Sequence, residues 1–110
     1  MTKPIMVAST HLGVFGGLVP DDQDLTVKTI TLDECRIVDE FGRFDDDVNR
    51  LATEGPDATA SISTPAEMTI HDITAVWAIT PAAWTKWQAG VWAPVGSRRG
   101  DRIGRTGGER

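Results

Sequence analysis

The sequence has few of the side chains on which enzymes depend. Its 110 residues include no tyrosine, two histidines (His11 and His71) and one cysteine, Cys35. A single cysteine excludes an internal disulfide, and it cannot form a zinc site without three other good ligands. The positions of Cys35 and the two histidines in the sequence do not indicate a catalytic Cys–His pair. We also do not expect His71 and Asp72 to form a catalytic dyad. We therefore expect no enzyme activity, no catalytic residues, no metal site and no cofactor.

Long apolar runs are also absent. No stretch approaches the roughly 20 residues that a membrane-spanning helix needs, and residues 1–6 lack the apolar core of a secretory signal. We expect a protein that is neither secreted nor inserted in a membrane. The length fits one domain. A core this small buries a limited fraction of the chain's surface, which favours self-association as a source of stability.

Positive charge is scarce outside the C-terminus. The chain carries 11 Lys+Arg against 16 Asp+Glu, for a net charge of −5. Residues 96–110, here called the C-terminal arm, have a net charge of +3, so residues 1–95 have a net charge of −8. Because nucleic-acid binding depends on neutralising phosphates, an acidic body makes direct nucleic-acid binding unexpected. The arm is rich in glycine and contains Arg98, Arg99, Arg102, Ile103 and Arg105.

The arm has two interpretations. A glycine-rich segment with one large apolar residue, Ile103, has little reason to fold alone, which favours a disordered solubilising tail. Alternatively, its arginines order against an acidic neighbour. The second interpretation makes the arm a contact to another subunit.

Strand patterns dominate the first third of the chain. Residues 5–10 and 12–18 read as extended, and residues 20–24 carry the proline and acidic residues of a turn. The run over 25–32 alternates in the manner of a half-buried strand, so the segments flanking the turn predict a hairpin. Residues 35–38 predict a further short strand.

The strongest strand is predicted over residues 68–79. Its alternation changes phase at His71–Asp72, which predicts a bulge or bend there. Residues 58–63 are weakly extended, and residues 91–95 return as an extended segment after the second helix.

Two short helices are predicted. Over residues 43–54, apolar side chains recur at helical spacing, Asp45–Asp47 occupy the first turn, and Gly55 is placed to end the helix. The second helix begins at Thr80–Pro81, an N-cap followed by proline, and ends at Gly90. The sequence thus predicts an α+β fold: one small, mostly antiparallel, β-rich domain over residues 1–95, with a curled sheet or partial barrel and two short helices.

Some charged and glycine-rich segments invite a ligand-binding interpretation that their spacing does not support. Residues 45–47 and 21–24 lack the spacing of a calcium loop, so a helix start and a polar turn explain them. Residues 13–17 lack the ending of a phosphate loop.

Tryptophan is the most unusual feature of the composition. Trp77, Trp84, Trp87 and Trp92 fall within sixteen residues. One interpretation is core packing, above all for Trp77 and Trp87. The other is an aromatic platform, because tryptophan is enriched at interface hot spots. Since a small core can hardly bury four indoles, we expect one or two of them at a partner contact. The candidate contact residues are Trp84, Trp87, Trp92, Arg98, Arg99, Arg102, Ile103 and Arg105.

A series of segments, taken in order, resembles a family of small uncharacterised proteins encoded by tailed phages and prophages. The segments are residues 11–17, 27–32 with 35–37, 51–56, 68–76, 80–84 and 91–92. The chain departs from that family at residues 41–44, where an aromatic-rich stretch is expected, and in its arginine-rich arm. The resemblance implies a phage origin and a β-rich fold, and no site residues carry over.

These observations support two hypotheses. The leading one is a non-enzymatic phage accessory protein, such as a capsid decoration or other virion component, that assembles with itself or with phage structural proteins. The alternative is an anti-defence protein that sequesters a small nucleotide or blocks a host protein; there, indoles would stack a base and arginines would bind its phosphates. The corresponding locations are the phage virion and the host cytoplasm. A closed pocket lined by indole and arginine would favour the alternative, and a flat apolar patch would favour assembly.

Overall fold

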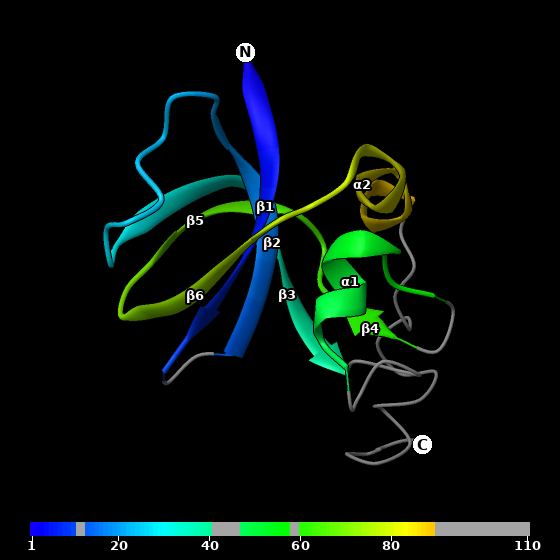
Figure 1. The fold of residues 1–110 in the computed structure, drawn as a ribbon. Coiled ribbons are helices and arrows are strands. Elements are labelled where there is room, and N and C mark those ends of the chain that lie inside the picture. The colour runs from blue at the N-terminus through cyan, green and yellow to red at the C-terminus, as the bar shows by residue number, and fades with distance from the viewer. Residues whose placement is uncertain (11–12, 41–46, 58–59, 90–110) are drawn as a thin grey trace.

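The computed structural model describes residues 1–10, 13–40, 47–57 and 60–89. In this part of the chain, six strands form a mostly antiparallel sheet and two short helices pack on it (Figure 1). The α+β fold with a mostly antiparallel, unclosed sheet and two short helices is therefore confirmed. The elements are β1 (Thr2–Ser9), β2 (Gly13–Pro20), β3 (Ile30–Glu40), α1 (Asn49–Thr53), β4 (Ser61–Ile62), β5 (Ala66–Ile70), β6 (Ile73–Ala78) and α2 (Pro81–Gln88).

The sheet has the strand order β4-β3-β2-β1-β6, and β5 pairs with β3. The first two strands form a hairpin in which Thr2 pairs with Pro20 and Ser9 pairs with Gly13. Strand β3 then runs beside β2, and both β4 and β5 lie antiparallel to β3. The N-terminal strand is therefore central, since β1 lies between β2 and β6.

A corner at His71–Asp72 joins two strands that belong to opposite sides of the sheet. Asp72 has a φ of 57°, a left-handed conformation that turns the chain sharply. Before the corner, β5 pairs with β3; after it, β6 pairs with β1. The predicted bend is confirmed, and it divides the predicted 68–79 strand into two. Because a two-residue corner connects opposite sides, the sheet must curl, and the two strands diverge from their common corner in Figure 1.

The strand predicted over residues 25–32 begins later than expected. Leu25–Lys28 form turns, and β3 starts at Ile30. The reason is local: the Asp24 carboxylate accepts hydrogen bonds from the Thr26 backbone N–H (2.9 Å) and hydroxyl (2.6 Å), which holds an Asx turn in place of extended backbone.

The separate strand predicted over residues 35–38 is also corrected. These residues continue β3, which spans eleven residues. Asp33–Glu34 form an irregularity within this strand: Glu34 has a φ of 50°, and the pairing of β3 with β5 shifts register between Leu32 and Cys35. The bulge bends the strand without ending it.

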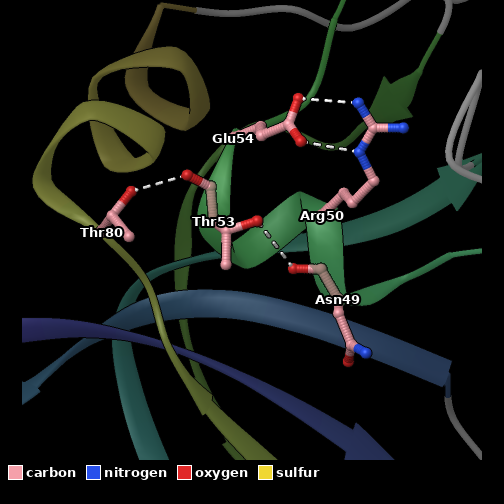
Figure 2. Close-up of polar contacts among 5 residues, drawn as sticks. All are labelled: Asn49, Arg50, Thr53, Glu54 and Thr80. Atoms are coloured by element: carbon pink, nitrogen blue, oxygen red, sulfur yellow. Dashed lines mark hydrogen bonds and ion pairs between the residues drawn. The ribbon is translucent and has the colours of Figure 1, made fainter.

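The first helix is shorter than predicted. It spans Asn49–Thr53 and has no acidic residue in its first turn, so the placement of Asp47 inside that turn is wrong. Residues 41–46 lie outside the described residues. The predicted end is confirmed, because Gly55 adopts a φ of +88° and its N–H donates to the Arg50 carbonyl oxygen at 3.1 Å. Arg50 also forms a bidentate ion pair with Glu54 (Figure 2).

The second helix starts as predicted. The Thr80 hydroxyl oxygen accepts a hydrogen bond from the Ala83 N–H at 3.1 Å, and Pro81 occupies the first helical position. The same hydroxyl donates to the Thr53 carbonyl oxygen at 3.0 Å, so one side chain caps α2 and ties it to the end of α1 (Figure 2). The predicted end at Gly90 and the extended segment at 91–95 lie outside the described residues.

The core has two parts because alternate residues of the strands point to opposite faces of the sheet. In β1, Met6 contributes to a cluster with the helix residues Leu51 and Trp87. Its neighbours Ile5 and Val7 contribute to a second cluster inside the curl of the sheet, which also contains Phe15, Leu32, Cys35 and Ile70. Both faces of the central strands are therefore buried.

Candidate functional site

The two tryptophans of α2 lie in the core. Trp87 has no exposed surface, and its indole N–H donates to the Leu51 carbonyl oxygen at 3.0 Å. Trp84 is 9% exposed and stacks on Trp87, with ring centroids 6.4 Å apart. The structure thus shows core packing, the first interpretation of these residues, for both. A fully buried indole touches no partner directly, so Trp87 can contribute to an interface only by holding α2 in place.

Trp77, for which core packing is predicted, and the remaining candidate contact residues lie outside α2. Trp77 is half-buried on β6, and its indole N–H donates to the Asn49 side-chain oxygen at 2.6 Å. Trp92 and the predicted arm residues Arg98, Arg99, Arg102, Ile103 and Arg105 lie outside the described residues. Their role in a partner contact stays a prediction.

An open strand edge is the feature of the structure that sequence reasoning missed. The Ile79 N–H donates to the Pro4 carbonyl oxygen at 3.2 Å, and Trp77 pairs with Met6. Backbone groups alternate in direction along an antiparallel strand, so the intervening Val76 and Ala78 direct their N–H and C=O groups away from β1. Within the described chain these outward groups have no hydrogen-bond partner.

The edge of β6 lacks the features that protect edges in other proteins. Exposed edges usually carry charged side chains or proline, which prevent pairing with another chain. Strands β4 and β5, which lie along the outer side of β3, are protected in both ways. Pro65 separates the two strands, and the exposed Glu67 lies in β5. Strand β6, with the sequence ITAVWA, has neither. Its edge is available for pairing.

A groove runs along this edge. It has a volume of about 430 Å³ and is lined by Leu25, Thr26, Val27, Lys28, Ile73, Thr74, Ala75, Val76 and Ala78. Its two walls are β6 and the segment before β3, which meet where the Ile73 N–H donates to the Lys28 carbonyl oxygen at 3.0 Å. Val27 is 38% exposed and, with Met1, is one of two large hydrophobic side chains exposed in the described chain. The groove thus has both apolar and polar walls, and it lies beside unpaired backbone.

Acidic side chains gather where the chain enters the groove. Asp21, Asp22 and Asp24 are exposed, and Asp24 immediately precedes the lining residue Leu25. Hydrogen bonds from the Thr26 hydroxyl and N–H lower the pKa of the Asp24 carboxyl, so it stays ionised at neutral pH and at mildly acidic pH. Lys28 is the one charged residue among those that line the groove.

The described histidine and cysteine lie in different surroundings. Within the described residues, no group of three or more His, Cys, Asp or Glu side chains could hold a metal ion. His71 Nδ1 lies 3.3 Å from the Thr29 hydroxyl oxygen, but this contact is exposed. The Cys35 thiol is fully buried, and burial raises its pKa to about 12.

Burial of Cys35 makes a simple prediction. The thiolate is the reactive form, and at pH 8 the raised pKa makes it about a thousandfold scarcer than in an unfolded chain with a thiol pKa of about 8.5. Native protein is therefore expected to react with a thiol-specific chromogenic reagent about a thousandfold more slowly than protein in denaturant. Because the unfolded thiol ionises first, stability is expected to fall as the pH rises above the pKa of the unfolded thiol. Rapid reaction of native protein at pH 8 would contradict the burial of Cys35.

These features define a class: a small α+β protein whose curled, unclosed, mostly antiparallel sheet leaves one uncharged strand edge beside a groove. The chain belongs to the family described as domain of unknown function DUF6948, which matches residues 2–87. The resemblance seen in the sequence is thereby confirmed as far as a domain family of unknown function. No curated protein and no solved structure matches the chain. No helix of the described residues is both long enough and apolar enough to cross a membrane.

Proposed function

We propose that this protein is a non-enzymatic assembly protein that associates with copies of itself or with other subunits. The observation that carries the proposal is the edge of β6: a strand without charge or proline whose outward backbone groups have no partner in the described chain. Unprotected edges of this kind pair with other chains. The placement of the described thiol and histidine supports the non-enzymatic part, since Cys35 is buried and the His71–Thr29 contact lies at the surface.

The narrower proposal is a virion accessory or decoration component of a tailed phage. What supports it is the resemblance of the sequence to proteins encoded by tailed phages, together with an acidic body and a basic arm that suit contacts between subunits. The alternative, sequestration of a small nucleotide, finds less support. The described residues that line the groove include no aromatic and no arginine side chain to stack a base or bind its phosphates.

The test is the absolute mass of the full-length protein in solution. Light scattering over a roughly hundredfold concentration range is expected to give a mass above that of the 11.9 kDa monomer, rising with concentration as mass action requires. A monomer at every concentration, also after mixing with phage structural proteins, would overturn the proposal. Screening for nucleotide binding would then be the next experiment.

A further inference from the structure

The groove beside β6 has the features of a site for an extended peptide. An added strand would pair with the outward backbone groups of Val76 and Ala78, while Leu25 and Val27 offer apolar contacts on the opposite wall. Strand addition of this kind gains affinity from main-chain hydrogen bonds and specificity from alternate side chains. The occupant should therefore be a short apolar segment without charge.

The charges beside the groove indicate the sign of the residues that flank such a segment. Asp21, Asp22 and Asp24 lie at the Leu25 end, so the occupant should continue into a basic stretch there. One segment of this chain has that order. Residues 91–95 have the sequence VWAPV, and the arm beyond them carries Arg98, Arg99 and Arg102. Residues 91–93 also repeat the Val-Trp-Ala sequence of residues 76–78 in β6 itself.

The segment that fills the groove must come from another copy. Trp87 holds the end of α2 over Gly16 in β2, on the face of the sheet that carries the helices. The groove lies beyond β1 and β6, roughly 10 Å further across the sheet, and its residues Leu25 and Val76 pack on the other cluster. One residue, Gly90, separates Ala89 from Val91, and the two steps along the chain span at most about 7 Å. Val91 of the same chain therefore falls short.

From this geometry we infer that residues 91–95 of a second copy add as a strand to the edge of β6, and that the arginines of its arm contact Asp21, Asp22 and Asp24. The inference rests on the proposed function and names its partner. It also gives a direction. Since the arginines come after the apolar segment and the aspartates lie at the Leu25–Ala78 end, the added segment runs parallel to β6. We place Pro94 beside Val76, where the proline nitrogen, which carries no N–H, faces away from β6. Trp92 then lies beside Thr74, and Gly96 lies beside Ala78.

Mixed disulfide formation between variants of the full chain that each carry one introduced cysteine tests both the partner and the direction. Thr74→Cys and Ala78→Cys introduce thiols at exposed positions of β6, whereas native Cys35 is buried and serves as an internal background. Each is mixed with Trp92→Cys or Gly96→Cys under mild oxidation, and products are separated without reductant. The two positions on each segment are about 13 Å apart, beyond the reach of one disulfide.

The expected result is rapid linkage of Thr74→Cys with Trp92→Cys and of Ala78→Cys with Gly96→Cys, roughly tenfold or more above the crossed pairs. Glu67→Cys, exposed on β5, is the control for random collision. Equal rates for all pairs, or rates matching the Glu67→Cys control, would overturn the inference. If the mass measurement still shows an oligomer, the assembly proposal stands and another surface is used. If the protein is monomeric, both fail.

Charge removal gives an independent test that leaves the groove intact. Asp21→Asn, Asp22→Asn and Asp24→Asn together keep the side-chain oxygen that accepts from Thr26 while removing three charges. The matched control removes three exposed charges elsewhere, with Asp33→Asn, Asp47→Asn and Glu67→Gln. The groove variant is expected to weaken self-association roughly tenfold or more, and only in the groove variant should added salt cease to weaken it. Equal effects of the two variants would reject the contact with the arm.

Discussion

Replacing Trp87 by alanine is expected to lower the free energy of unfolding by about 3–5 kcal/mol, as truncation of a large buried aromatic side chain does in other cores. Trp87 has no exposed surface and packs among residues of β1, β2 and both helices. Its loss also leaves the Leu51 carbonyl oxygen without its donor at 3.0 Å, which adds the cost of a buried unsatisfied group. Urea denaturation followed by circular dichroism measures the change.

Two variants help to distinguish the loss of packing from the loss of the hydrogen bond to Leu51. Trp87→Phe keeps most of the ring but removes the N–H, so its loss should be smaller than that of Trp87→Ala. Thr85→Ala, an exposed position on the same helix, controls for changes in helix stability and should shift unfolding by about 0.5 kcal/mol or less. A loss below about 1 kcal/mol for Trp87→Ala would show that this indole does not hold α2 on the sheet.

Replacing Gly16 by alanine is expected to cost about 2–3 kcal/mol, although it adds a single methyl group. A Cβ at this position would lie 2.6, 2.8 and 2.9 Å from three ring carbons of Trp87, which is closer than packed atoms tolerate. Gly16 pairs with Met6 on one side and with Arg36 on the other, so the strand has little freedom to move away. The methyl group therefore displaces the indole.

A double-mutant cycle identifies the cause. In a Trp87→Leu background the ring carbons are gone, so Gly16→Ala is expected to cost less than about 1 kcal/mol. The coupling between the two substitutions then measures the steric contact itself. If Gly16→Ala costs the same in both backgrounds, the effect arises from the strand backbone, and the close approach of Trp87 to β2 is not what requires glycine.

Local chemistry made several elements predictable from the sequence. Thr80–Pro81 starts α2, and Gly55 ends α1, because a capping hydroxyl and a left-handed glycine act within one helical turn. The corner at His71–Asp72 was visible as a change of phase in the alternation. The start of β3 was missed although its cause is equally local, since the Asx turn at Asp24–Thr26 competes with strand formation in a run of suitable residues.

The open edge was beyond sequence reasoning for a different reason. Whether β6 is central or at an edge depends on which strands pair with it, and its partner β1 is about seventy residues away in the chain. The groove likewise requires that Leu25–Lys28 stop short of forming a strand. The composition did not decide whether the tryptophans lie in the core or at an interface. Trp87 is buried because Gly16 in β2 leaves space for its ring.

The central position of β1 has a consequence for synthesis of the chain. The β1–β2 hairpin is synthesised before β6, so the second side of β1 stays unpaired until residues 73–78 have been made. Over that interval a strand containing Ile5, Met6 and Val7, all fully buried in the finished fold, has an exposed edge. Contacts between strands that are far apart in the sequence also form slowly, because a long loop must close first. The nascent chain is therefore most prone to aggregation before β6 is complete.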